Sequence, residues 1–152
     1  MGKLFFLKKI QGDLMTKEHE NVAIVKLLFE TVEQGNIPDA LNLFSEDLYW
    51  QSPVTRTGSK ELSWFKPRYN RKELAEFFKE LRNKVITEKF EFGDFTAQED
   101  KVVVEGKNRG TVLSTGQVYE HDWVMIFELK DKKITKQQHF YDTADLVKYF
   151  TE

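Results

Sequence analysis

The chain has 152 residues, of which 40% are hydrophobic, and this length and composition suit one domain with its own buried core. Its 23 basic and 25 acidic residues give a formal net charge of −2, without the basic excess usual in nucleic-acid binders and membrane-surface binders. There is no cysteine, which excludes disulfides, thiolate metal sites and cysteine nucleophiles. No stretch approaches the ~20 apolar residues that span a bilayer. We therefore expect a cytoplasmic protein with no nucleic-acid and no membrane partner.

Residues 1–15 are predicted to be an extension ahead of a single domain at 16–152. Met15 begins a segment that reads like a natural start, and the apolar run at 4–7 is too short for the core of a secretory signal. We interpret the extension as a disordered tail. The alternative is a strand or short helix that docks on a partner subunit.

Three helices are predicted in the first half of the chain. Residues 16–34 carry apolar side chains three and four positions apart, and Gly35 follows as a stop signal. A short second helix is expected around Pro38, a residue suited to the first helical turn, with Phe44 on its apolar face. The third helix is predicted at 71–84.

The second half is predicted to be nearly all strand, after one short strand at 48–54. The further strands are expected near 90–95 and at 101–112, 117–129 and 134–142, with a last helical turn or two at 143–150. Helices followed by an antiparallel meander make an α+β plan. Aromatic residues form 14% of the chain, which suits the lining of a curved sheet around a cavity, although the aromatic rings could also simply fill it.

Two segments resemble the SnoaL-like and ketosteroid-isomerase-related proteins of the nuclear transport factor 2-like superfamily. Residues 29–54 read FETVEQGNIPDALNLFSEDLYWQSPV, and residues 116–150 read GQVYEHDWVMIFELKDKKITKQQHFYDTADLVKYF. The order and spacing of their motifs carry the resemblance, which extends over 16–150. It implies a cone-shaped α+β fold in which N-terminal helices pack inside a strongly curved antiparallel sheet. It also implies a homodimer formed through the outer face of that sheet.

The resemblance does not imply that this chain catalyses the reaction of the steroid isomerases. Their catalytic base, oxyanion tyrosine and protonated aspartate fall at Ser52, Leu28 and Trp123, and a serine cannot replace a carboxylate base without its own activator. The arginine and aspartates of limonene epoxide hydrolases are also absent from the last two strands. SnoaL-type cyclases, which use a histidine and an aspartate in this region, offer the closer pattern.

His121, His139 and Tyr141 are the candidate catalytic residues. Strand alternation places His121 and Trp123 on one face of their strand and His139 and Tyr141 on one face of the next. The alignment with the isomerases implies that these faces line the cavity, with Trp123 opposite His139 and His121 opposite Tyr141. A slip of one residue would turn the other faces inward. A histidine in an apolar pocket can serve as acid or base, and burial lowers its pKa. We hypothesise that His139, with His121 or Tyr141, transfers a proton on a bound apolar carbonyl compound or epoxide. The alternative is that both histidines only shape the pocket.

A set of aromatic and small polar side chains is predicted to bind the ligand around these residues. The set consists of Trp50, Ser52, Phe44, Phe78, Asn108, Trp123, Met125 and Gln137. Gly106, beside Asn108, is expected to leave room for the ligand. No cofactor and no metal is predicted, because the histidines and nearby acids lack a tight ligand spacing.

Three functions remain open at this point: an enzyme, a non-catalytic binder of a small apolar ligand, and a protein-interaction domain. Val124 and Ile126 alternate with Trp123 and Met125, so both faces of one strand are apolar, which predicts sheet-to-sheet dimerisation under all three. The loop at 55–70 is interpreted as a lid on the pocket. A basic cluster at its end, formed by Lys66, Arg68, Arg71 and Lys72, could meet an anionic substrate, with a solvated loop as the alternative.

Overall fold

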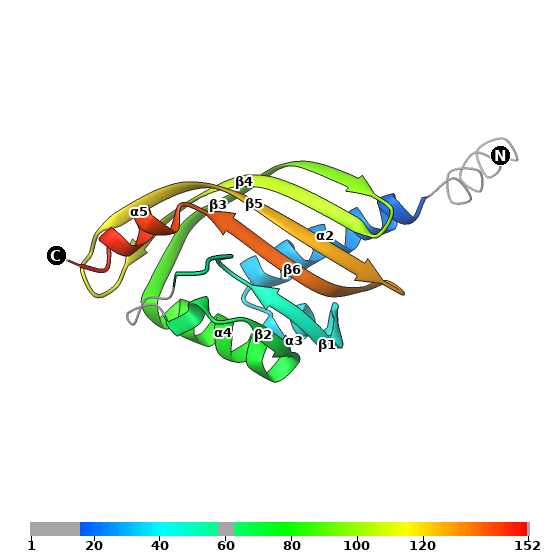
Figure 1. Cartoon of the computed structure of the whole chain (residues 1–152), viewed down its shortest axis with the longest axis horizontal. Helices are drawn as coiled ribbons and strands as arrows, with labels where there is room; N and C mark the ends of the chain where they lie inside the picture. The colour runs from blue at the N-terminus through cyan, green and yellow to red at the C-terminus, as the bar shows by residue number, and fades with distance from the viewer. Residues whose placement is uncertain (1–15, 58–62, 152) are drawn as a thin grey trace, which may run out of the picture.

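The computed structural model describes residues 16–57 and 63–151, so the predicted extension at 1–15 lies outside the described residues. The α+β prediction is confirmed: helices pack against one strongly curved sheet of six strands (Figure 1). The helices are α2 (Lys17–Glu33), α3 (Ile37–Asn42), α4 (Arg71–Lys84) and α5 (Thr143–Lys148), with a 3-10 turn η1 (Ser63–Phe65). The strands are β1 (Phe44–Gln51), β2 (Arg68–Asn70), β3 (Val85–Gln98), β4 (Lys101–Val112), β5 (Val118–Lys130) and β6 (Lys133–Tyr141).

Polar caps fix where the helices begin. The Thr16 hydroxyl accepts a hydrogen bond from the backbone of His19 at the start of α2, and the Asn70 side chain accepts one from Glu73 at the start of α4. Gly35 follows α2 with φ +73°, a left-handed conformation that glycine adopts without strain. The predicted helices at 16–34 and 71–84 are therefore confirmed to within a residue or so.

The sheet follows the order β2-β1-β6-β5-β4-β3, with β3 to β6 forming an antiparallel meander and β1 running parallel to β6. In Figure 1 the four long strands arch over α4 and α3, and α5 lies beside the β4–β5 turn. Phe44 begins β1 and does not belong to the α3 face, which corrects the sequence-based expectation.

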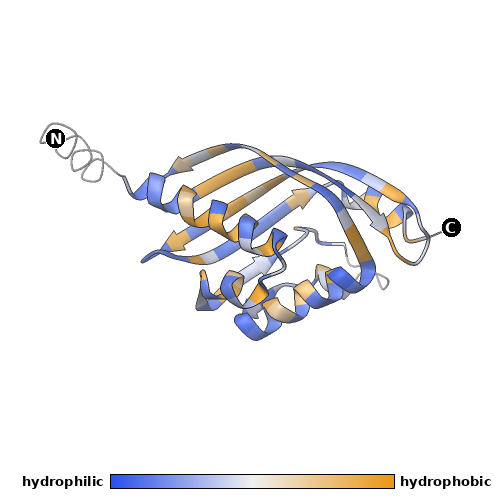
Figure 2. Cartoon of the chain, turned by 180° about the vertical axis from the view of Figure 1, so that it is seen from behind, coloured by the Kyte–Doolittle hydropathy of each residue, from blue (hydrophilic) through white to orange (hydrophobic). Residues whose placement is uncertain are grey.

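The inward face of β5 and β6 is the one that the alignment with the isomerases implies, since His121, Trp123, Met125 and His139 are all buried. The expected pairing between these strands is wrong by two residues: Trp123 pairs with Tyr141, and Met125 pairs with His139. A slip of two residues leaves every side chain on the same face, so the hydrophobic pattern cannot detect it. Figure 2 shows apolar and polar residues alternating along the strands.

The space beside Gly106 is filled by the protein itself. A Cβ placed on Gly106 would lie 2.1 Å from Cζ2 of Trp123, and the Trp123 ring stacks on Phe90 with centroids 4.8 Å apart. The glycine therefore makes room for an indole of the core, and the expectation that it makes room for a ligand is wrong. Among the described residues, no helix has the length and apolar character needed to cross a membrane.

Candidate active site

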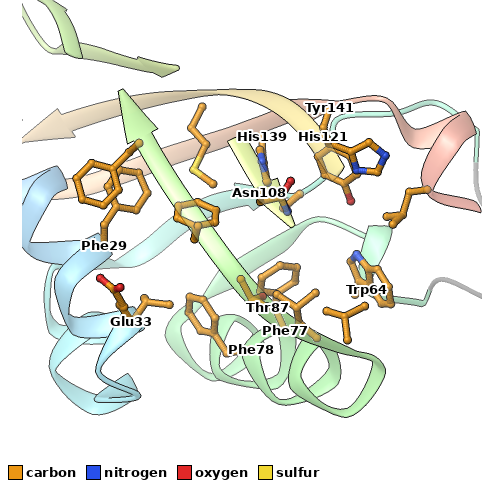
Figure 3. Close-up of a pocket in the computed structure, with 18 of the residues that line it drawn as sticks. Phe29, Glu33, Trp64, Phe77, Phe78, Thr87, Asn108, His121, His139 and Tyr141 are labelled. Carbon is orange, nitrogen blue, oxygen red and sulfur yellow. Dashed lines mark hydrogen bonds between the residues drawn. The ribbon is translucent and has the colours of Figure 1, made fainter. Parts of the chain in front are cut away.

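A cavity of about 350 Å³ lies between the curved sheet and the helices α2 and α4, within the usual size range of small-molecule sites. Figure 3 shows Asn108, His121, His139 and Tyr141 gathered on one side and Phe77 and Phe78 on the other. The described wall is formed by Leu28, Phe29, Val32, Glu33, Trp50, Ser52, Trp64, Phe77, Phe78, Leu81, Val85, Thr87, Glu88, Phe90, Phe92, Asn108, Tyr119, His121, Met125, His139, Tyr141 and Leu146.

Most of the predicted site residues meet in this cavity. The structure brings together His121, His139, Tyr141, Trp50, Ser52, Phe78, Asn108 and Met125. Three others lie outside the wall. Phe44 packs edge-on against Trp50, Trp123 stacks on Phe90 behind the wall, and Gln137 is fully buried in the core.

His139 is held in the interior by Ser52. The Ser52 Oγ lies 2.8 Å from Nδ1 of His139, while Nε2 of His139 is buried without a partner. Burial, and to a smaller extent the proximity of His121, lowers the pKa of His139 to about 3. His139 is therefore neutral at ordinary pH and suited to hydrogen bonding, but it is a very weak base.

His121 has a different environment, because a carboxylate lies beside its ring. Nε2 of His121 is 2.8 Å from Oδ2 of Asp145 on α5. A carboxylate only accepts hydrogen bonds, so Nε2 carries the proton and Nδ1 of the neutral ring presents its lone pair. Nδ1 is buried without a partner. This arrangement provides an oriented base with a counter-charge for the histidinium that it forms.

Two tyrosines enclose His121. Its ring stacks on Tyr119 at 5.3 Å and on Tyr141 at 5.8 Å between centroids, and Tyr141 also lies 4.8 Å from the ring of His139. Burial raises the pKa of Tyr119 to about 12 and raises the pKa of Tyr141 as well, the latter opposed by a side-chain hydrogen bond with Trp64. Both phenols stay protonated near neutral pH and can donate hydrogen bonds.

Four buried polar atoms of the wall have no partner within the described protein: Nε1 of Trp50, Oδ1 of Asn108, Nδ1 of His121 and Nε2 of His139. A buried polar group without a partner costs about 1–3 kcal/mol. Four such atoms on one cavity therefore indicate that a ligand or ordered water forms the hydrogen bonds that they lack.

Several wall residues were missed by the sequence reasoning. Trp64, from the loop at 55–70, is buried in the wall, and Leu146 of α5 also contributes. Asp145 was not assigned either, although a histidine–aspartate pair was expected from the resemblance to cyclases. Its position 24 residues beyond His121 leaves no local signal, because only the docking of α5 brings the two together.

Among the described residues, the predicted basic cluster of Lys66, Arg68, Arg71 and Lys72 does not contribute to the cavity wall. Arg68 is buried beneath Phe77 and lies 3.4 Å from Glu80, and Arg71 donates to the backbone carbonyl of Phe44. Arg68 therefore holds β2 against α4, and Arg71 holds α4 against β1, so neither side chain is available to an anionic substrate in the described wall. Part of the loop, 58–62, lies outside the described residues.

The mouth of the cavity is acidic. Glu33 and Glu88 are the charged side chains of the described wall other than the histidines, and both are exposed. Glu88 is held by Arg109 at 3.1 Å. In the described part of the chain, no group of three or more histidine and acidic side chains could hold a metal ion.

Comparisons with known proteins agree with this architecture. Residues 25–137 match the family model of a SnoaL-like domain. A solved NTF2-like protein from Burkholderia xenovorans is 26% identical with a TM-score of 0.78, and the match covers 89% of this chain and 98% of that chain. No curated protein matches this chain.

Two further solved structures show the same fold at lower identity. TerC, co-crystallised with polyporic acid, is 19% identical with a TM-score of 0.77, over 88% of this chain and 99% of that chain. A proposed polyketide cyclase from Xanthomonas campestris is 16% identical with a TM-score of 0.72, over 90% of this chain and 100% of that chain.

Proposed function

The chain belongs to the SnoaL-like domain family, and from this premise we propose that it is a proton-transfer enzyme acting on a small, mostly apolar carbonyl compound. One observation carries the proposal: His121 is bonded to Asp145 through Nε2 while Nδ1 remains unpartnered in the cavity. A structural histidine in a core usually has both ring nitrogens engaged, so the free lone pair favours a base.

The proposed step breaks a C–H bond beside the carbonyl group. Nδ1 of His121 takes the proton, the electron pair moves onto the carbonyl oxygen, and an enolate results. Asp145 stabilises the histidinium across the 2.8 Å contact. Returning the proton to another carbon would give isomerisation, and attack of the enolate carbon on a second carbonyl would give ring closure.

The enolate oxygen needs hydrogen-bond donors, and the cavity contains suitable ones. Tyr141 keeps its phenolic proton because burial raises its pKa. The second donor is His139, whose Nε2 carries a proton when the Ser52 hydroxyl donates to Nδ1. Donors fixed in a water-poor cavity stabilise developing negative charge more strongly than water does.

The assignment reverses the roles first expected for the two histidines. A base is most useful when its pKa lies near the working pH, and burial holds the pKa of His139 at about 3. His139 therefore orients and stabilises the substrate oxygen, and His121 moves the proton. The similarity to TerC and to a proposed polyketide cyclase supports a cavity that accepts a small organic ligand.

Hydrogen–deuterium exchange tests the proposal without knowledge of the natural substrate. β-Tetralone is a small apolar ketone with enolisable hydrogens, and NMR in heavy water follows their exchange. We expect the wild-type protein to accelerate exchange and His121→Gln to lose that acceleration by about 100-fold or more. His19→Gln, at an exposed histidine outside the cavity wall, is the matched control and should retain it. Equal acceleration by the wild type and His121→Gln would overturn the proposal, and binding without exchange would favour a non-catalytic ligand-binding domain.

We also propose that two copies of the chain associate through the outer face of the sheet. Val124 and Ile126 lie there half-buried, and Phe140, which pairs with Val124, is exposed. An apolar face of this kind is usually covered by a partner. Sedimentation should show a dimer that Phe140→Lys dissociates; a monomeric wild type would contradict this.

A further inference from the structure

Asn108 is a polar residue of the cavity that the proposed proton transfer does not use. It lies on β4, where its backbone pairs with His121 on β5 and with Phe90 on β3. Figure 3 shows its side chain beside His139 and His121. Its Oδ1 atom is buried and has no partner in the described protein. Leaving this oxygen unpartnered costs about 1–3 kcal/mol, which a bound ligand would recover.

The oxygen of Asn108 accepts hydrogen bonds and cannot donate them. A simple ketone has no group to offer it, since the carbonyl oxygen of a ketone is itself an acceptor. Nδ1 of His121, on the neighbouring strand, is also an acceptor in the neutral ring and is reserved for the C–H proton in the proposed reaction. An additional O–H or N–H on the substrate is therefore needed to donate a hydrogen bond to Oδ1 of Asn108.

The charges of the wall limit the substrate further. Among the described wall residues there is no lysine or arginine, and the charged side chains at the mouth are the acids Glu33 and Glu88. Arg109 lies next to this region but is engaged by both Glu88 and Glu120. A carboxylate entering the cavity past these acids would meet no lysine or arginine among the described wall residues, at a considerable cost in desolvation.

We propose that the substrate is an uncharged hydroxy-carbonyl compound, and that Asn108 is the specificity-determining residue that binds its hydroxyl group. This rests on the proposed function, which places the carbonyl oxygen near Tyr141 and His139 and the acidic C–H near His121. The hydroxyl group then lies next to the reacting carbon, on the side of β4.

The test is a binding comparison of three aryl ketones of similar size by calorimetry near neutral pH. α-Hydroxyacetophenone carries the carbonyl and the hydroxyl, α-methoxyacetophenone lacks the donor, and benzoylformate carries a carboxylate. We expect the hydroxy compound to bind roughly tenfold more tightly than the methoxy compound, the value of one hydrogen bond to a buried acceptor. Benzoylformate should bind most weakly.

Two variants identify the residues responsible. Asn108→Leu should bring the affinities of the hydroxy and methoxy compounds together, and Asn108→Ala serves the same purpose if the leucine variant does not fold. Glu33→Gln, the control at the mouth, should leave that ratio unchanged and improve binding of benzoylformate.

The outcomes separate this inference from the proposed function. Equal affinities of the hydroxy and methoxy compounds for the wild type, a ratio that survives in Asn108→Leu, or tight binding of benzoylformate would overturn the inference. None of these results would affect exchange of β-tetralone at His121. Failure of all three ketones to bind would overturn the inference, whereas loss of exchange alone would overturn only the proposed chemistry.

Discussion

Nε2 of His121 lies 2.8 Å from Oδ2 of Asp145 and so connects the centre of the sheet to the short C-terminal helix α5. The same helix contributes Leu146 to the cavity wall, and Asp142 caps its first turn by accepting a hydrogen bond from the backbone of Asp145. Asp145 therefore has two consequences. It orients the proposed base, and it fixes the segment that closes one end of the cavity.

Asp145→Asn should retain this geometry and weaken the chemistry. The asparagine oxygen can still accept from Nε2 of His121, but the histidinium loses its counter-charge, so exchange of β-tetralone should fall at least tenfold. Asp142→Asn is the matched control, because asparagine caps helices as well as aspartate does. Equal losses in the two variants would show that α5, and not the His121–Asp145 pair, is what matters.

The stability of the protein should fall on acidification through His139. Its pKa is about 6.5 in the unfolded chain and is lowered to about 3 in the folded protein, chiefly by burial. Between these values the unfolded state binds a proton that the native state excludes, so the free energy of unfolding decreases as pH falls, by up to about 1.4 kcal/mol per pH unit. Denaturant titrations at several pH values in this range should show that the free energy of unfolding depends less steeply on pH in His139→Gln than in the wild type. Parallel slopes would show that His139 is not buried as a neutral ring.

The contact between Gly106 and Trp123 can be tested through stability. Gly106→Ala would place a methyl group 2.1 Å from the indole and 2.4 Å from the carbonyl oxygen of Glu91, so we expect a loss of about 1–3 kcal/mol in denaturant unfolding. Gly93→Ala, on the adjacent strand β3, is the control because its nearest atom is 3.4 Å away. An unchanged denaturant midpoint for Gly106→Ala would contradict the close contact between Gly106 and Trp123.

Ser52→Ala should destabilise the protein by leaving Nδ1 of His139 buried and unpartnered. The expected cost is about 1–3 kcal/mol. Ser63→Ala removes an exposed hydrogen bond to Glu80 and should cost less than about 0.5 kcal/mol. Thermal unfolding of the two variants side by side would detect the difference, and similar small losses would argue against the Ser52–His139 bond.

The sequence was a good guide where local patterns decide the structure. The helical spacing predicted the third helix with the bounds of α4, Arg71–Lys84, and the alternation of β5 predicted that His121, Trp123 and Met125 share one face. Both follow from a repeat of 3.6 or 2 residues, which a single sequence displays directly.

Contacts between residues far apart in the sequence could not be predicted from those patterns. The pairing of β5 with β6 was displaced by two residues, because such a slip leaves the alternation intact. The Trp64 contribution to the wall and the His121–Asp145 pair depend on how a loop and a terminal helix dock. The cavity wall was therefore predicted in composition more than in geometry.

The proposed proton transfer requires that neutral His121 hold its proton on Nε2 and offer Nδ1 to the cavity. Long-range proton–nitrogen NMR correlations on isotope-labelled protein report the protonation of each imidazole nitrogen. We predict that the neutral ring of His121 carries its proton on Nε2 and leaves Nδ1 unprotonated, and that Asp145→Ala weakens this preference. A proton on Nδ1 of neutral wild-type His121 would contradict the account, because the cavity would then face a donor where the reaction requires a base.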